Sequence, residues 1–345
     1  MSRALIVHRA GPGVTLQDQG RPGYLGFGLS RGGAADRLAL AEGAALLGQG
    51  DDLAAIEMAG LGGEFEAGDD MRIALTGAPM RASIDGARIA WNASHALPQG
   101  ARLSIGGAEQ GSYGYLHIGG GVDVAAQLGA RGAHLAAGVG HAVRAGDDLP
   151  LGEDPKPGAV GQGITPLPRF DGGTVRVVPS LQTDFFGPDQ IAGFEATDFH
   201  RDTRGSRMGV RLIAEAADPL HSDAGLSVLS EVVVPGDIQI IGDGTPFVLL
   251  SECQTTGGYP RICSVLPCDL PIVAQAQPGA TLRFAFVALQ DAVEAERRAA
   301  AHRAGLRDGL WPLVRDPHDI ADLLSYQLIG GVTAGTELDQ EKAQT

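Results

Sequence analysis

The sequence is poor in aromatic residues and cysteine, and it has no long apolar run. Phe, Trp and Tyr make up 5% of the 345 residues. Cys253, Cys263 and Cys268 are odd in number and lack CxxC spacing, so we expect neither a disulfide framework nor a zinc site. No apolar run approaches the roughly 20 residues that cross a bilayer, and the N-terminus lacks a signal-peptide pattern. These absences predict a cytoplasmic protein.

Basic residues are scarce relative to acidic ones. The chain has 26 Lys and Arg against 41 Asp and Glu, a formal net charge of −15. Nucleic acids and anionic membranes would be repelled at long range, so neither is expected as a partner. A small anionic metabolite remains open, because local arginines dominate the field over a few ångströms.

The sequence also lacks the usual signatures of metal and nucleophile sites. Its nine histidines show no HExxH motif or i,i+4 pair, and we interpret His134 and His141 as structural or surface residues. There is no GxSxG elbow, and Cys253 has no histidine beside it to act as a base. We therefore predict no metal site.

Glycine, by contrast, is abundant. The 52 glycines are about twice the usual share and have no G-X-Y period, which indicates tight turns between short strands. Ala82–Ile84, Asp85-Gly86 and 87–89 predict a hairpin with a type I′ turn. Helices are predicted at 34–47, with Asp36 in the first turn, and at 291–303.

The length allows two domains with cores of their own. The only long Pro/Gly-rich segment without periodicity begins at Gly152, and it is the best linker candidate. We predict a mainly β fold of two cyclophilin-like β-barrel domains with a few peripheral helices. The predicted segments are an N-terminal β domain (1–151), a linker (152–170), a C-terminal β domain (171–290) and a helical and flexible tail (291–345).

The polar heptad Gln254-Thr255-Thr256-Gly257-Gly258-Tyr259-Pro260 lies between two apolar runs. Short apolar runs bounded by Gly and Pro are typical of strands, so the heptad is predicted to be a loop that leaves a sheet. Its hydroxyls, carboxamide and exposed backbone could hold a polar or anionic ligand. A tight β-turn with satisfied hydroxyls would have the same pattern.

A second group of polar residues lies near the N-terminus. Asp18 and Arg21 are close enough to pair, and Gly32-Gly33 could present N–H groups to an anion where a helix begins. A purely structural turn, in which Asp18 supports Arg21, fits equally. The segment has no GKS/T ending, so it is not a Walker P-loop.

A third group lies in the C-terminal half. Arg207 lies in an apolar, Gly-limited context, where a guanidinium could clamp a carboxylate or phosphate. A carboxylate (Glu231 or Glu252) and a carboxamide (Gln239 or Gln254) could polarise or protonate an amide. Alternatively, these residues simply form exposed turns.

Taken together, these segments resemble the biotin-dependent carboxyltransferase-like family, also called allophanate hydrolase subunit 2. The resemblance covers roughly residues 4–290. The matching segments, in order, are Thr15–Gly23, Ser30–Asp36, Leu75–Ala78, Gly119–Asp123, Ser206–Leu212, Ser230-Glu231, Pro235–Gln239 and Gln254–Pro260.

The resemblance implies a role as the C-type subunit of a 5-oxoprolinase-type complex, in which 5-oxo-L-proline is hydrolysed to L-glutamate with ATP. The enzyme would be a lactam hydrolase acting on a cyclic C–N bond and active only with partner subunits. The implied partners are the A-type and B-type (KipI-like) subunits. ATP, with Mg²⁺, would enter through the complex.

The resemblance also suggests roles for individual residues. Arg207 would bind the substrate carboxylate, Glu252 would act as acid or base, and Gln239 would orient the amide. The heptad would bind the ring amide or phosphoryl oxygens through Gln254, Thr255, Thr256, Gly257, Gly258 and Tyr259.

Three positions depart from the family pattern. Glu252 and Arg261 stand where Asp and Lys are common, and Ala35 stands where Met is usual. Two alternatives therefore stay open: a carboxyltransferase component that uses biotin and acts on urea or a similar amide, and a regulatory binding protein that antagonises a Kip-type kinase inhibitor.

Overall fold

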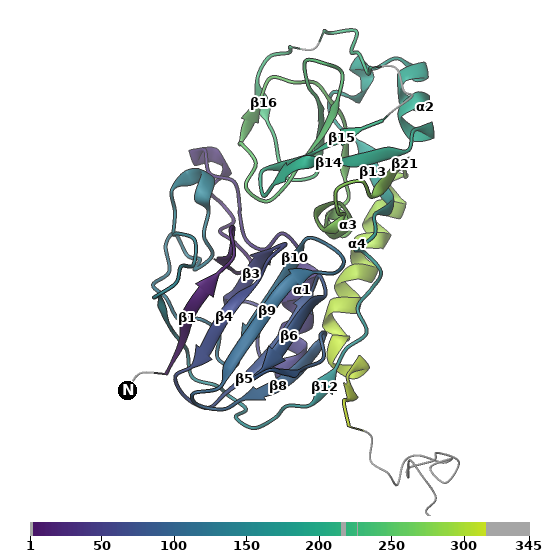
Figure 1. Ribbon diagram of the computed structural model, residues 1–345. Coiled ribbons are helices and arrows are strands. Elements are labelled where there is room, and N and C mark those ends of the chain that lie inside the picture. The colour runs from purple at the N-terminus through teal and green to yellow at the C-terminus, as the bar shows by residue number, and fades with distance from the viewer. Residues whose placement is uncertain (1–2, 215–218, 226, 315–345) are drawn as a thin grey trace, which may run out of the picture. The chain divides into compact units, whose positions relative to one another are not determined.

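Short antiparallel strands dominate the computed structural model, which describes residues 3–214, 219–225 and 227–314. A first sheet contains β1, β4, β9 and β6 side by side (Figure 1). Its strands, in spatial order, are β11 (Asp148–Pro150), β1 (Ala4–Ala10), β4 (Gly63–Ala67), β9 (Arg102–Ala108), β6 (Met80–Ile84) and β7 (Ala87–Arg88).

A second sheet packs against the first. The two share one apolar cluster, in which Leu5 and Phe65 of the first sheet meet Ile56, Ile73 and Leu116 of the second. The arrangement is that of two sheets stacked face to face around a core. The strands of the second sheet, in spatial order, are β2 (Thr15–Gln17), β3 (Ala55–Ala59), β10 (Tyr113–Ile118), β5 (Met71–Gly77), β8 (Ala93–Leu97) and β12 (Gln162–Gly163).

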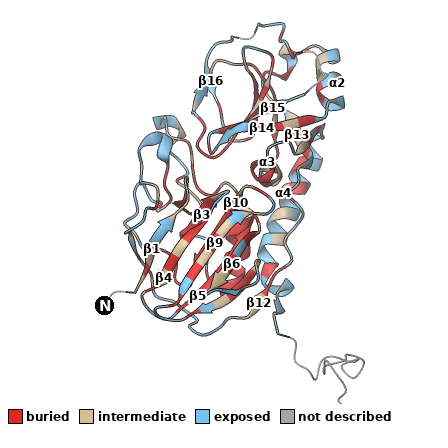
Figure 2. Ribbon diagram, viewed as in Figure 1, coloured by how far each residue is buried: buried red, intermediate tan, exposed pale blue. Residues whose placement is uncertain are grey.

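The burial of each strand follows from what covers it (Figure 2). β4 alternates buried and half-buried residues, as expected for a sheet with one face toward the core. β5 and β10 are buried throughout, because α1 (Arg37–Leu47) packs on their other face. Most residues of these two strands are apolar, which is why they were predictable.

The helix α1 begins later than predicted. Its first residue is Arg37 rather than Ala34, because Asp36 caps the helix and accepts a hydrogen bond from Ala39 N at 3.1 Å. Its end agrees with the prediction: Gly48 adopts the left-handed conformation (φ 61°) that closes many helices.

The C-terminal half contains a closed seven-stranded barrel, and its apolar core forms one cluster with Ala39 and Leu40 of α1 and Tyr115 of β10. Most neighbours are antiparallel, but β13 and β21 pair in parallel. The barrel strands, in spatial order, are β13 (Gly173–Pro179), β20 (Arg261–Val265), β17 (Asp237–Ile240), β18 (Pro246–Leu249), β15 (Gly209–Ile213), β14 (Phe199–Ser206) and β21 (Thr281–Phe286). The remaining helices are α2 (Pro188–Ala196), α3 (Leu270–Gln275) and α4 (Leu289–Ala304).

The structure confirms the mainly β fold class and the predicted hairpin. Asp85 (φ 48°) and Gly86 (φ 82°) both have positive φ, as a type I′ turn requires. The heptad is not wholly a loop, because Thr256–Gly257 forms β19 and pairs with β16 (Glu231–Val232). The proposed domain boundaries stay a prediction, and residues 315–345 of the predicted tail lie outside the described residues.

Buried polar contacts tie the barrel half to the sheets within the compact unit Met1–Trp311. Arg169 donates to Asp36 at 2.7 Å and to Glu42 at 2.6 Å. Gln275 of α3 donates to Asp36 at 2.8 Å and accepts from the backbone N–H of Tyr113 at 2.9 Å. These contacts hold the N-terminal part of α1 in place, and the residues of the candidate site lie beside it. None of the helices that the structure describes combines the length and the apolar character of a membrane span.

Acidification is expected to destabilise the fold through His117 of β10, which lies under α1. Burial lowers the pKa of His117 from 6.5 to about 3. Below pH 6.5 the unfolded chain therefore binds a proton that the folded chain does not, and stability falls as the pH falls. From pH 7 to pH 5 this one residue should cost about 2 kcal/mol. Urea unfolding of the wild type and of His117→Gln at pH 7 and pH 5 measures this loss of stability. If the stability of the variant depends on pH as much as that of the wild type, His117 is not the cause.

Candidate functional site

Arg207 lies in the tight turn between β14 and β15 and is 9% exposed. Its Nε donates to Glu252 at 2.6 Å, its Nη2 donates to the carbonyl of Gly33 at 2.5 Å, and its Nη1 donates to Glu57. Burial opposes its charge, but Glu57 and Glu252 raise the pKa of Arg207. The guanidinium is thus neutralised by two carboxylates of the chain itself, and its predicted binding of a substrate carboxylate stays a prediction.

Glu57 is the partner that the sequence did not reveal. It lies in β3, is fully buried, and accepts hydrogen bonds from Tyr115 Oη at 2.7 Å and Ala35 N at 2.8 Å. A single acid inside the apolar strand 55–59 was the available signal, because carboxylates are almost never fully buried unless paired. Arg207 and Glu57 thus join the barrel to the start of α1.

Glu252 connects this ion pair to a histidine. One of its oxygens accepts from Arg207, and the other accepts from Ala136 N at 3.2 Å. That second oxygen lies 3.9 Å from His134 Nδ1, which makes no hydrogen bond among the described residues. His134 Nε2 lies 2.8 Å from Ser30 Oγ, and both side chains are buried. Ser30, His134 and Glu252 therefore follow one another as a hydroxyl, an imidazole and a carboxylate.

The electrostatics around His134 favour a neutral imidazole. Burial lowers the pKa of His134, against the opposing effect of the Glu252 carboxylate. A carboxylate beside Nδ1 favours the tautomer that carries its proton there and leaves Nε2 free to accept from Ser30. The arrangement can move a proton between Ser30 and His134. We refer to Ser30, His134 and Glu252 as the relay.

The relay adjoins a cavity of about 290 Å³. Ser30 and Ser251 are among its polar lining residues, and Leu250, Leu270 and Pro271 are among the apolar ones. Three arginines line it as well, Arg21, Arg31 and Arg37, and no aspartate or glutamate of the described residues does. The cavity is thus cationic within a strongly acidic chain.

Asp18 and Arg21 do not pair with each other as predicted. Asp18 accepts from the backbone N–H groups of Gly20, Arg131 and Gly132 at 2.8, 2.6 and 3.1 Å. Arg21 donates to the carbonyls of Gln127 and Gly132. Both side chains therefore hold the 127–132 loop, because its backbone groups lie closer than either charged group does to the other.

The predicted anion site at Gly32-Gly33 is also corrected. The helix starts only at Arg37, Gly32 N donates to Ser251 O at 3.0 Å, and Gly33 O accepts from Arg207. Both glycines have positive φ, and a side chain at Gly33 would lie 2.6 Å from Gly20 N. Glycine is needed at both positions because the backbone packs closely there. This packing shapes the cavity, and the two glycines do not offer their N–H groups to a ligand.

The carboxamides and the heptad form a separate group. Gln254 Nε2 donates to Gln239 Oε1 at 3.1 Å, and Gln239 Nε2 is buried without a hydrogen-bond partner among the described residues. The backbone of Thr255 pairs with Val233, and Tyr259 is 43% exposed. Neither Gln239 nor any heptad residue lines the relay cavity. Glu231, the alternative carboxylate, is bound by Arg261 at 2.5 Å.

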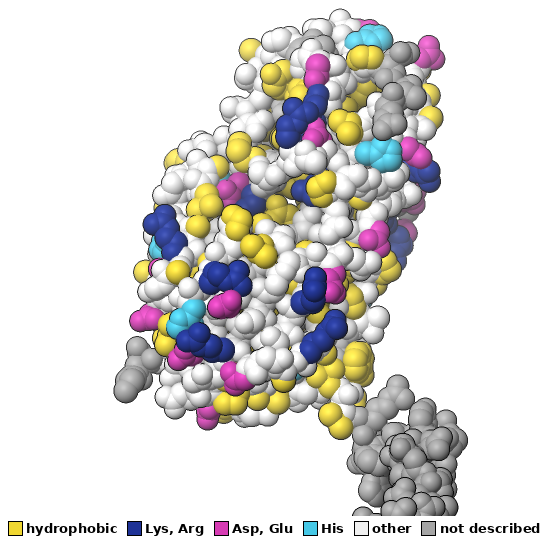
Figure 3. Space-filling view, viewed as in Figure 1, with side chains coloured by type: hydrophobic (Ala, Val, Ile, Leu, Met, Phe, Trp, Pro, Cys, Tyr) yellow, Lys and Arg dark blue, Asp and Glu magenta, His cyan; other side chains and the backbone are white. Residues whose placement is uncertain are grey.

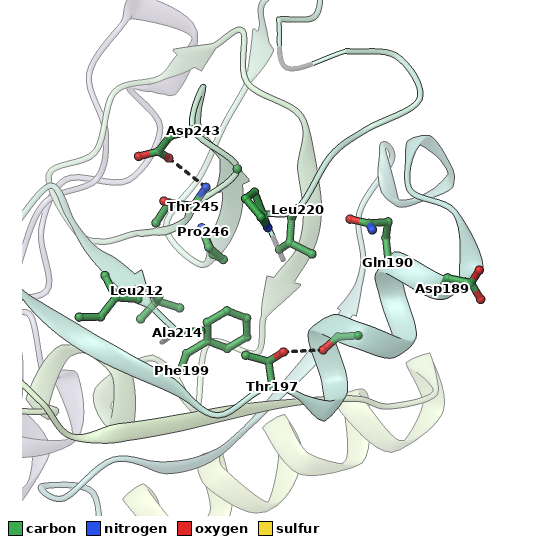
Figure 4. A pocket seen from close by; sticks show the side chains of 14 residues that line it. Asp189, Gln190, Thr197, Phe199, Leu212, Ala214, Leu220, Asp243, Thr245 and Pro246 are labelled. Carbon is green, nitrogen blue, oxygen red and sulfur yellow. Dashed lines mark hydrogen bonds between the residues drawn. The ribbon is translucent and has the colours of Figure 1, made fainter. Parts of the chain in front are cut away.

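A larger cavity of about 510 Å³ lies at one end of the barrel (Figure 4). Phe199, Leu212 and Leu220 line it, and Asp243 there accepts from Thr245 N at 3.0 Å. Neither the relay residues nor Arg207 line this larger cavity. On the face shown in Figure 3, several basic side chains have an acidic neighbour. Elsewhere in the chain, Arg9 pairs with Glu64 at 3.0 Å. Over the described ranges, no group of three or more His, Cys, Asp or Glu could hold a metal ion.

The family described as "Carboxyltransferase domain, subdomain A and B" matches residues 27–286. The chain belongs to this family, as the sequence motifs indicated.

The chain is also similar to individual known proteins. The chain is 32% identical over 289 residues to the C subunit of 5-oxoprolinase from Haemophilus influenzae, covering 83% of this chain and 92% of the relative. It is 31% identical over 299 residues to the corresponding 5-oxoprolinase subunit of Escherichia coli, covering 85% and 94%. It also shares the fold of Kluyveromyces lactis urea carboxylase, with a TM-score of 0.80 and 23% identity over 92% of this chain and 31% of that one.

Proposed function

We propose that the chain is the C-type subunit of an ATP-dependent 5-oxoprolinase-type complex, active together with A-type and B-type (KipI-like) subunits. The observation that carries the proposal is the relay, a neutral histidine bonded to a serine that lines a small cationic cavity, with a carboxylate 3.9 Å from its other ring nitrogen. Identity of 32% to the C subunit of a 5-oxoprolinase over most of both chains supports the choice of reaction.

Opening the lactam requires proton transfers that the relay suits. An oxygen from water joins the carbonyl carbon, the C–N bond breaks, and the nitrogen takes up a proton to give L-glutamate. Ser30 passes a proton to or from His134, while Glu252 stabilises the imidazolium that forms. Arg207, itself paired with Glu57, holds Glu252 in place, and neither Arg207 nor Glu57 touches the substrate.

ATP, with Mg²⁺, would activate the lactam oxygen when bound to the complex. The cavity of about 290 Å³ lies at the small end of the range for ligand sites, which suits a single ring better than a nucleotide. We therefore place the nucleotide with the partner subunits.

Reconstitution of the complex tests this function. The chain is mixed with its A-type and B-type partners, and glutamate is measured with ATP and 5-oxo-L-proline. We expect glutamate release that requires ATP and all of the subunits. Release that is undiminished when this chain is omitted, or no release from the intact complex, would contradict the proposal.

The shared fold with urea carboxylase supports a second candidate, a biotin-dependent carboxyltransferase component acting on urea or a similar amide. Carboxylation of urea from carboxybiotin by the same preparation, without glutamate release, would favour it. A stable complex with a KipI-like partner but no turnover of either amide would instead favour a regulatory binding protein.

A further inference from the structure

The three arginines of the relay cavity have no acidic counter-charge. Over the described ranges, none of Arg21, Arg31 and Arg37 forms an ion pair with an acidic side chain, although the chain carries a net charge of −15. Burial, with repulsion from Arg31 and Arg303, lowers the pKa of Arg37 to about 10, so it remains charged at neutral pH. Bringing like charges together has a free-energy cost that a bound anion would remove.

Two buried polar groups at the cavity lack partners among the described residues. Arg21 is 1% exposed and its Nη1 makes no hydrogen bond, although the other guanidinium nitrogens bind backbone carbonyls. Ser251 Oγ is likewise buried and unpartnered. Both atoms are almost fully enclosed, so they border the cavity without opening into it, and the uncompensated charge of the arginines is what indicates an anionic ligand.

The rest of the wall limits what that ligand can be. Leu250, Leu270 and Pro271 contribute apolar surface from the barrel half. The volume of about 290 Å³ leaves room for one compact ring. A strongly hydrated inorganic anion would make no apolar contact with this wall.

We propose that this cavity binds a small organic acid, a single carboxylate on a compact ring, with the carboxylate held by Arg31 and Arg37, the buried Arg21 adding positive charge, and the ring beside Ser30. Guanidinium groups suit a carboxylate because their N–H donors match its two oxygens. The proposal rests on the proposed function for the identity of the ring, 5-oxo-L-proline. It reassigns carboxylate recognition from Arg207 to the cavity arginines, and it disfavours urea, which has no carboxylate.

Equilibrium binding to the full-length chain tests the proposal, with 5-oxo-L-proline and its uncharged analogue 2-pyrrolidinone measured by calorimetry. We expect 5-oxo-L-proline to bind at least about 10-fold more tightly, because hydrogen bonds to charged groups make a large contribution to binding. Arg37→Gln should remove most of that difference and leave 2-pyrrolidinone unchanged. Arg37 makes no side-chain hydrogen bond or ion pair to any described residue, so this variant is expected to fold. Arg297→Gln, an exposed change on α4, is the matched control for net charge.

The same variants in the reconstituted complex separate this proposal from the proposed function. Arg37→Gln should raise KM for 5-oxo-L-proline about 10-fold and leave kcat unchanged, with Arg31→Gln as a second variant. If the carboxylate preference is found but the complex releases no glutamate, the site stands and the proposed function fails. If the complex releases glutamate while both variants keep the wild-type KM, or if the two ligands bind equally, the carboxylate site is overturned.

Discussion

Arg207→Met is expected to destabilise the protein by about 3–5 kcal/mol, because it leaves Glu57 and Glu252 buried without their shared counter-charge. Most domains are stable by only about 5–15 kcal/mol, so the variant should show a large drop in its urea midpoint. The effect exceeds that of most single substitutions because both carboxylates lose their partner together.

Arg204→Met is the matched control for this prediction. Arg204 lies in β14, just before the turn that holds Arg207, is largely exposed and pairs with Asp202 at 2.7 Å, so its loss should leave the urea midpoint nearly unchanged. Adding Glu57→Gln and Glu252→Gln to Arg207→Met should restore part of the lost stability. An Arg207→Met midpoint within error of that of Arg204→Met would show that the buried ion pairs do not hold this part of the fold together.

His134→Asn is expected to lower kcat of the reconstituted complex by about 10²–10⁴-fold, the usual contribution of a positioned acid–base group. The substrate binds to the arginines in this account, so KM should change little. His141→Asn, an exposed change in the same part of the chain, should leave both constants unchanged.

The pH profile distinguishes proton transfer from a structural role. The pKa of His134 is lowered by burial, so the neutral base persists below pH 6.5 and is lost only as the pH falls further. The wild type should therefore show an acid limb below pH 6.5 that is absent from the residual activity of His134→Asn. A variant with wild-type kcat, or with reduced kcat and an unchanged acid limb, would remove His134 from the relay.

Local patterns made the fold class predictable. β5 and β10 are apolar runs bounded by turns, and Asp85-Gly86 needs positive φ at both residues. The start of α1 was misplaced because Ala34 and Ala35 are strong helix formers, whereas the cap at Asp36 overrides that propensity. The pairing of β19 with β16 was missed because it depends on a distant strand.

The site was predictable only in part, for a related reason. Arg207 and Glu252 stood out by residue type, and the structure brings them within 2.6 Å. Ser30 and His134 lie 104 residues apart in the chain, and nothing local to either indicates the contact. Glu57 redirected the interpretation of Arg207, because a second carboxylate changes the guanidinium from a ligand clamp into a structural cation.

The most direct test is steady-state glutamate release by complexes that contain wild-type chain, Arg37→Gln or His134→Asn, assayed in parallel. If this chain holds the lactam, Arg37→Gln raises KM about 10-fold at constant kcat, and His134→Asn lowers kcat at constant KM. Wild-type kinetics from both variants in an active complex would show that the lactam is bound and opened elsewhere.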